Sequence, residues 1–127
     1  MKRSPNFRYD LTRAAKRAQE FADERDWEQY HSPKNLVMAI VGEIGELSSL
    51  LQWKSDDEIT QMLVNDEDRR QIEEEVADVA IYLIRFSQIA GIELAQVIDE
   101  KFRANERKYP VHISKGSAEK YRNLDHE

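Results

Sequence analysis

Hydrophobic residues recur along this chain at spacings of three and four, which is the period of an amphipathic α-helix. The first such segment covers about residues 10–27. Its apolar stripe is narrow and made mostly of small side chains: Leu11, Ala14, Ala15, Ala18, Phe21 and Ala22. A second helix is expected from Pro33 to about Lys54. Ser32 supplies a capping hydroxyl ahead of it, and proline is favoured as the first helical residue.

The pattern weakens before a third helix begins. Residues 56–66 are predicted to form a polar connection with one possible turn around Ile59. The third helix is expected from about Asp66 to Gly91, because glycine is favoured where a helix ends. Its second half, residues 76–90, is apolar nearly all round, so we expect it at the centre of the fold.

The last predicted helix covers about residues 94–108. It stops before Pro110, whose ring cannot continue the hydrogen-bond ladder of a helix. The remaining residues, 111–127, are expected to form a polar tail. Four helices with short connections predict an all-α fold, a four-helix bundle. A single domain is expected over residues 1–127, with its core at about residues 7–110.

Composition narrows the classes of function. The 127 residues carry a formal net charge of −6, so a general nucleic-acid-binding protein is not indicated. The chain has no cysteine, which excludes disulfides, thiol catalysis and cysteine-ligated metals. Its basic start is not followed by the apolar run of a signal peptide, and no apolar stretch approaches the ~20 residues that span a bilayer. We therefore expect a cytoplasmic protein with no nucleic-acid or membrane partner.

The apolar surface of the third predicted helix is wider than one small bundle can cover. Some of its residues are therefore expected to contact a second copy of the chain, because a large exposed apolar patch is unfavourable. The candidates are Ala77, Ala80, Ile81 and Ile84. The pattern thus predicts an oligomer.

Four acidic residues lie where apolar residues are expected. At about 100° per residue, Glu43 falls in the middle of the apolar face of the second helix, and Glu46 falls about 60° to one side. On the third helix, Glu75 and Asp78 repeat this arrangement. Two helices thus each present an acidic pair, Glu-x-x-Glu and Glu-x-x-Asp, within a hydrophobic stripe.

Buried carboxylates need compensating positive charge. One explanation is structural: basic side chains from another helix form salt bridges with the acids. Arg85 is the one basic residue that shares their face, and one arginine cannot neutralise four acids. A bound divalent metal is the favoured explanation. No histidine lies on the predicted helices, and carboxylate oxygens suit Mg²⁺ or Mn²⁺, which points to a substrate that carries phosphates.

Aromatic and basic residues provide candidate contacts for such a substrate. Trp27 and Trp53 flank the second helix, where an indole ring either stacks on a nucleotide base or packs in the core. Lys101, Asn105 and Lys108 belong to a basic cluster near the end of the fourth helix. This cluster is either a solvated helix end or a phosphate contact. The chain has no Walker A sequence or glycine-rich loop that would cradle phosphates.

These motifs resemble the all-α nucleoside triphosphate pyrophosphohydrolases of the MazG-like group. The likeness rests on Glu43-x-x-Glu46 followed 29 residues later by Glu75-x-x-Asp78. More narrowly, several ordered segments are similar to the dCTP pyrophosphatase branch: residues 24–31, 33–36, 41–47, 51–54, 105–112 and 115–121. The resemblance covers about residues 7–122.

The resemblance implies Mg²⁺-dependent hydrolysis of a (d)NTP, dCTP or a related or modified deoxynucleotide, to the monophosphate and pyrophosphate. It implies metal-binding and catalytic roles for Glu43, Glu46, Glu75 and Asp78. It implies nucleotide contacts by Trp27, Trp53, Tyr82, Lys101 and Asn105, with Lys108, Lys115 and Lys120 as further candidates for phosphate. It also implies a homodimer or homotetramer, a dimer of dimers, with sites between subunits.

The chain departs from that branch at Ala18, where members carry a histidine that contacts the base. Because this base contact is missing, the resemblance does not carry a strict preference for cytosine or 5-methylcytosine over to this chain. A function of another class stays open: a non-catalytic, oligomeric helical module that binds a nucleotide or a protein and has a salt-bridged acidic cluster. Stabilisation by Mg²⁺ distinguishes a metal site from such a cluster. Release of the γ-phosphate is a second enzymatic alternative, and product analysis separates it.

Overall fold

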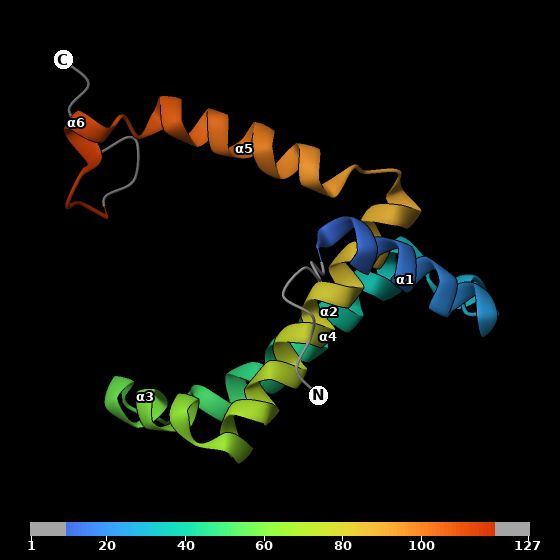
Figure 1. Ribbon diagram of the computed structural model, residues 1–127, viewed down its shortest axis with the longest axis horizontal. Helices are drawn as coiled ribbons and strands as arrows, with labels where there is room; N and C mark the ends of the chain where they lie inside the picture. Colours follow the sequence, from blue (N-terminus) through green and yellow to red (C-terminus); the bar gives the residue numbers. More distant parts are fainter. Residues whose placement is uncertain (1–9, 119–127) are drawn as a thin grey trace, which may run out of the picture. The chain divides into compact units, whose positions relative to one another are not determined.

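The structure is a computed structural model that describes residues 10–118. Every regular element in that range is helical, which confirms the predicted all-α fold (Figure 1). The helices are α1 (Leu11–Glu24), α2 (Pro33–Leu51), α3 (Asp56–Val64), α4 (Asp66–Ala90), α5 (Leu94–Lys108) and α6 (Val111–Ser114), with the 3-10 helix η1 (Glu28–Tyr30) between the first two. The predicted tail beyond residue 118, which includes Lys120, lies outside the described residues.

Local side-chain signals account for where the helices begin and end. The Asp10 side chain caps α1 by accepting a hydrogen bond from the backbone N–H of Arg13 at 3.0 Å. The Ser32 hydroxyl accepts one from the N–H of Asn35 at 3.1 Å, so the predicted start of α2 is confirmed. Gly91 ends α4 as predicted, with a φ of +69° that glycine adopts without steric penalty.

The first predicted helix ends earlier than its apolar pattern indicates. α1 stops at Glu24, and Asp26 adopts a positive φ of 52°, which a continuing helix does not allow. Trp27 therefore lies in the turn between α1 and η1 rather than on a helix. The second predicted helix is also shorter, since α2 stops at Leu51 rather than near Lys54.

The polar connection predicted at residues 56–66 is wrong, because most of it forms α3. The Ser55 hydroxyl accepts a hydrogen bond from the N–H of Glu58, and the Glu58 carboxylate accepts one from the N–H of Ser55, both at 3.2 Å. This reciprocal capping box starts the helix. The acidic residues of the first turn, which the sequence pattern assigns to the polar connection, are stabilised by the positive end of the helix dipole.

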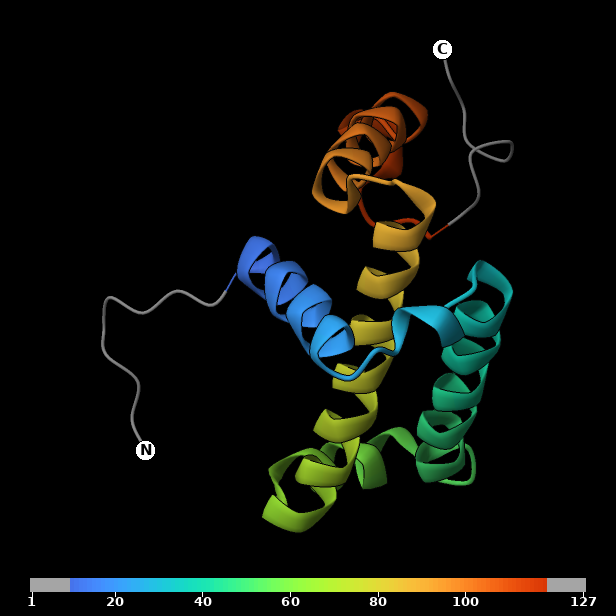
Figure 2. The same cartoon turned by 90° about the vertical axis from the view of Figure 1, so that its right-hand side faces the viewer.

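The first compact unit extends to Ile92 and is built around α4. α1, α2 and α3 all pack against α4, which confirms the central position expected for this helix. Figures 1 and 2 agree that α2 lies alongside α4, while α1 crosses it. The buried apolar core of the described residues is small and comes from α1, α2 and α4: Ala22, Leu36, Ile72 and Ile84.

The second compact unit begins at Glu93 and contains α5 and α6. α5 ends before Pro110, as predicted. The tail predicted from residue 111 is partly wrong, because residues 111–114 form the single turn of α6. Within the part of the chain that the structure describes, no single helix has the length and apolar character needed to cross a membrane. Two bent pairs of consecutive helices would be long and apolar enough if each pair were counted as one span. These pairs are α2 with α3 and α4 with α5.

Large apolar side chains remain exposed on both long helices of the first unit. On α2, Met38 is 56% exposed and Val41 is 59% exposed. On α4, Ile81 is 49% exposed, whereas Ile84, which was also a candidate for contact with a second copy, is buried within this chain. Contiguous exposed apolar surface of this kind is unfavourable in water, so these side chains are candidates for contact with another protein chain.

Candidate active site

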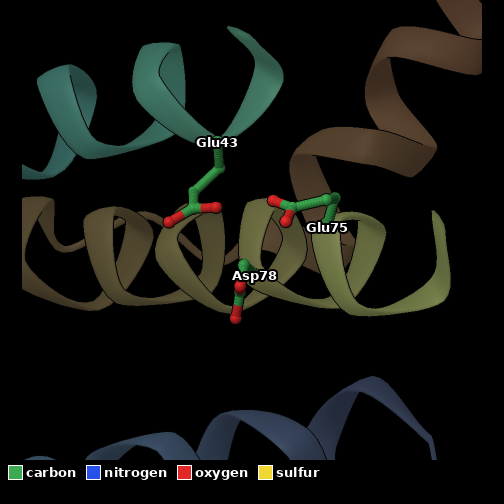
Figure 3. A group of neighbouring side chains, drawn as sticks. All are labelled: Glu43, Glu75 and Asp78. Atoms are coloured by element: carbon green, nitrogen blue, oxygen red, sulfur yellow. The ribbon is translucent and has the colours of Figure 1, made fainter. Parts of the chain in front are cut away.

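Three of the four predicted acids come together between α2 and α4. One carboxylate oxygen from each of Glu43, Glu75 and Asp78 lies within 4.8 Å of the others. Figure 3 shows Glu43 projecting from α2 toward α4, which carries Glu75 and Asp78. The two acids of α4 share a face because residues three apart are neighbours on a helix. The packing of α2 on α4 thus places acids from two sequence motifs in one group.

Glu46, the fourth predicted acid, is not part of that group of three. Its side chain is exposed on α2, about one turn after Glu43. Its carboxylate nevertheless lies near enough to Glu75 to raise the pKa of that residue. Glu46 therefore borders the acidic cluster, the name used below for Glu43, Glu75 and Asp78.

The surroundings of the cluster disfavour the ionised form of Glu75. The pKa of Glu75 is raised from 4.5 to about 7. The largest cause is side-chain hydrogen bonding with Glu43, followed by desolvation and by the negative charge of Glu46. Each of these favours the protonated carboxyl group. The cluster therefore holds more negative charge than its surroundings compensate.

No compensating side chain of the described residues bonds to these acids. Oε2 of Glu43 and Oε2 of Glu75 are buried and accept no hydrogen bond within residues 10–118. The ion pairs between described residues lie elsewhere: Lys16–Glu20, Arg25–Glu24, Arg69–Glu73 and Arg103–Asp99. Unpaired buried carboxylate oxygens fit the ligand type that a hard divalent cation prefers.

The partners of Arg85 were not anticipated from the sequence. Its guanidinium donates hydrogen bonds to His31, Gln19 and Gln88 and to none of the acids. The first two partners lie 54 and 66 positions away in the sequence, so no local pattern indicates them. The one basic residue expected on the acidic face is thus engaged with other side chains.

The aromatic candidates differ in packing and in exposure. The indole ring of Trp27 packs edge-on against Phe21, with 5.6 Å between ring centroids. Tyr82 is half-buried on α4, one turn after Asp78, and therefore lies on the face that carries the acids. Trp53 follows α2 and is 86% exposed.

The basic candidates belong to the second compact unit. Lys101, Asn105 and Lys108 all lie on α5. Lys101 and Asn105 line a hollow in the surface of this helix together with Val97, Ile98 and Phe102. The lining thus combines three apolar side chains with an amine and an amide. The contact of these residues with a nucleotide stays a prediction.

The acidic cluster between α2 and α4 makes this an all-α protein with a candidate metal centre between two helices. A sequence model of the MazG-like family matches residues 38–124, a range that includes both acidic pairs. The chain belongs to the MazG-like family.

Similar curated proteins carry the name dCTP pyrophosphatase 1. The one from Bos taurus is 47% identical over 107 residues, which is 84% of this chain and 63% of that protein. The one from Homo sapiens is 43% identical over the same shares. The chain therefore spans less than two thirds of the length of these relatives. A solved structure of a pyrophosphatase from Archaeoglobus fulgidus matches with a TM-score of 0.72 at 36% identity, over 85% of this chain and 99% of that one.

Proposed function

We propose that this protein is a Mg²⁺-dependent nucleoside triphosphate pyrophosphohydrolase. It converts a (d)NTP, dCTP or a related or modified deoxynucleotide, to the monophosphate and pyrophosphate. The observation that carries the proposal is the acidic cluster, with its buried and unpaired oxygens, in a MazG-like chain. The relatives named dCTP pyrophosphatase 1 support the substrate class.

In this proposal Glu43, Glu75 and Asp78 bind the divalent metal, and Glu46 contributes from the edge of the cluster. Oxygen ligands from carboxylates suit Mg²⁺, with Mn²⁺ as the alternative. When bound, such an ion neutralises phosphate charge and makes water more acidic. The raised pKa of Glu75 supports this assignment, because a cation would relieve the repulsion that disfavours its ionisation.

The proposed reaction is attack of water on the α-phosphorus. The bond between that phosphorus and the oxygen that bridges to the β-phosphorus breaks, and pyrophosphate leaves with the bonding electrons. Glu46 orients the water and takes up its proton, a role that suits a carboxylate exposed beside the cluster. Lys101 and Lys108 stabilise the negative charge on the departing pyrophosphate.

The nucleotide itself is held by aromatic and polar side chains in this proposal. Trp27, Trp53 and Tyr82 contact the base and the sugar, and Asn105 with Lys101 binds the rest of the nucleotide. The exposed ring of Trp53 supports such a role, since an uncovered indole offers a face for stacking. Ala18 stands where the related branch has a histidine that contacts the base. In this proposal the choice of base is therefore set by Trp27, Trp53 and Tyr82.

We also infer that the protein forms a homodimer or homotetramer. The exposed apolar residues of α2 and α4 support this, because a second copy would cover them. Residues 1–127 act as one domain in this proposal. Its place of action is the cytoplasm, and a net charge of −6 is consistent with the absence of a nucleic-acid partner.

The test is product analysis. The purified protein is incubated with a panel of canonical and modified (d)NTPs, with Mg²⁺ or with EDTA, and the products are resolved by anion exchange. We expect monophosphate and pyrophosphate in the presence of metal only. A diphosphate with inorganic phosphate would instead indicate cleavage at the γ position. The absence of turnover, together with a melting temperature that Mg²⁺ leaves unchanged, would favour a non-catalytic binding module.

A further inference from the structure

A buried arginine away from the acidic cluster joins three segments of the first compact unit. Arg85 on α4 is 2% exposed. Its Nε donates a hydrogen bond to Nδ1 of His31 at 3.2 Å. Its Nη1 donates to Oε1 of Gln19 at 2.9 Å and to Oε1 of Gln88 at 2.7 Å. Because Gln19 belongs to α1 and His31 follows η1, one guanidinium ties both segments to α4.

Amide side chains extend this network along α1. Nε2 of Gln88 donates to the backbone carbonyl of Ala15 at 2.6 Å, which holds α1 to α4 at a second point. Nε2 of Gln19 donates to Oδ1 of Asp23 at 2.8 Å. The carboxylate of Asp23 therefore reaches the guanidinium only through an intervening amide.

Stability alone does not account for an arginine at this position. The acceptors that bond to Arg85 are two amides and an imidazole, and none is a carboxylate. Its Nη2 is buried without an acceptor among the described residues. Replacing a buried charge and its partners together by well-packed apolar side chains of similar volume is often neutral or stabilising. What arginine adds is geometry, because its planar fork holds several acceptors in fixed positions.

The segment that Arg85 holds is the turn that carries Trp27. The backbone N–H of Trp27 donates to the carbonyl of Ala22 at 3.0 Å, and its indole ring packs against Phe21, so one side of the turn is attached to α1. His31 lies four residues later, at the other side of η1. Its hydrogen bond from Arg85 attaches that side to α4.

We propose that Arg85 is a positioning residue for Trp27: it fixes the tryptophan-bearing turn between α1 and α4 and thereby sets the affinity for the nucleotide base. The inference rests on the proposed function, in which Trp27 contacts the base. Arg85 has no bond to the acidic cluster, so the chemical step does not depend on it. Loss of Arg85 therefore weakens substrate binding and leaves turnover of bound substrate nearly unchanged.

The test replaces Arg85 with methionine in the full chain. The protein has two tryptophans, so labelling with 5-fluorotryptophan gives two ¹⁹F resonances, which Trp53→Phe assigns. In Arg85→Met we expect the Trp27 resonance to narrow and shift toward that of the free amino acid, while the Trp53 resonance stays in place. The KM for dCTP should rise about tenfold, with kcat changed by less than about twofold.

A second variant approaches the same contact from the other side. His31→Ala removes the acceptor of the Nε hydrogen bond and leaves α4 intact, so it should shift the Trp27 resonance and the KM in the same direction. The double variant should differ little from Arg85→Met. Both single changes remove the same hydrogen bond between Arg85 and His31, so their effects should not add. Arg70→Met is the matched control. Arg70 is exposed on α4, and its loss should leave both readouts at wild-type values.

The outcomes separate this inference from the proposed function. Wild-type values of KM and of the Trp27 resonance in Arg85→Met and His31→Ala would overturn it, as would a loss of kcat at unchanged KM. A lower melting temperature with an unchanged Trp27 resonance would show a purely structural arginine and overturn it too. If Arg85→Met does not fold, His31→Ala decides by the same readouts. A wild-type protein that hydrolyses no nucleotide refutes the proposed function instead, and the Trp27 resonance still reports whether Arg85 fixes the turn.

Discussion

Glu43 and Glu75 meet across two helices with one buried, unpaired oxygen each. An ion pair with a basic side chain would lower the pKa of Glu75, because an opposite charge favours the ionised carboxylate. The pKa is instead raised to about 7, and side-chain hydrogen bonding with Glu43 is the largest cause. The raised pKa indicates that no counter-ion among the described residues compensates the charge of Glu75. Removal of either charge, or addition of a cation, should relieve the same repulsion.

The change Glu43→Gln tests this balance. We expect the variant to melt at a higher temperature than wild type in EDTA, because one repelling charge is gone. It should lose the stabilisation by Mg²⁺, and its turnover should fall by at least roughly 100-fold, since metal-ion catalysis contributes several kcal/mol. Differential scanning fluorimetry and nucleotide product assays measure these effects. Glu20→Gln, on the exposed surface of α1, is the control and should behave like wild type. Turnover above a few per cent in Glu43→Gln would contradict the ligand assignment.

The raised pKa of Glu75 also predicts opposite pH trends with and without metal. The folded protein in EDTA binds more protons than the unfolded chain between pH 4.5, the ordinary value for glutamate, and about 7. The stabilising contribution of Glu75 should therefore be fully present below pH 4.5 and be lost as pH rises through about 7. Metal binding requires the ionised form, so the affinity for Mg²⁺ should rise over the same interval. Melting curves from pH 5 to 8, with Mg²⁺ or EDTA, should diverge as pH increases. Parallel curves would contradict the coupling of Glu75 to the metal.

Helical periodicity predicts part of this residue-level picture. It places Glu43, Glu75 and Asp78 on inward faces of their helices, and the structure brings them together. Their role as metal ligands stays a prediction. The position of Glu46 at the edge depends on how α2 packs alongside α4, which a one-dimensional pattern does not contain. The partners of Arg85 are invisible for the same reason, since they come from segments brought together only by folding.

At the scale of elements, α3 shows how composition and capping can give different predictions. Acidic residues dominate its first turn, and a polar segment between two strong helices favours the interpretation as a loop. The spacing of Ser55 and Glu58 is nevertheless that of a capping box, and the structure forms both of its hydrogen bonds. The start of α3 could therefore be predicted from the sequence. The end of α1 at Glu24 could not, because it depends on the backbone conformation of Asp26.

The capping box gives a stability prediction for this element. Ser55→Ala removes the hydroxyl that accepts from the N–H of Glu58, and we expect the free energy of unfolding to fall by about 1 kcal/mol. Urea denaturation followed by circular dichroism measures the change. Ser49→Ala is the matched control, because the Ser49 hydroxyl bonds to the carbonyl of Gly45 within α2 and caps no helix end. An equal loss in both variants would show that Ser55 does not act as a cap.

At the scale of the whole molecule, the apolar surface is distributed more widely than the sequence pattern predicts. The pattern assigns the excess to the third predicted helix, and Ile81 is indeed exposed there. α2 exposes as much, including Met38 and Val41. Periodicity shows that a face is apolar but not whether the same chain covers it. A small buried core beside exposed apolar side chains on α2 and α4 favours self-association, which stays a prediction.

Met38→Glu tests self-association directly. A charge at this exposed position should have little effect on the fold of one chain, because Met38 is 56% exposed. It should oppose burial of the same surface between two copies, since an unpaired charge in an apolar interface is strongly unfavourable. We expect wild type to sediment as a dimer or tetramer at micromolar concentration, with a melting temperature that rises with concentration, and Met38→Glu to shift toward monomer and lose that dependence. Thr60→Glu, which places the same charge on the exposed surface of α3, should leave the assembly intact. A wild-type protein that sediments as a monomer throughout would refute the prediction, and the exposed apolar residues of α2 and α4 would then need a different partner.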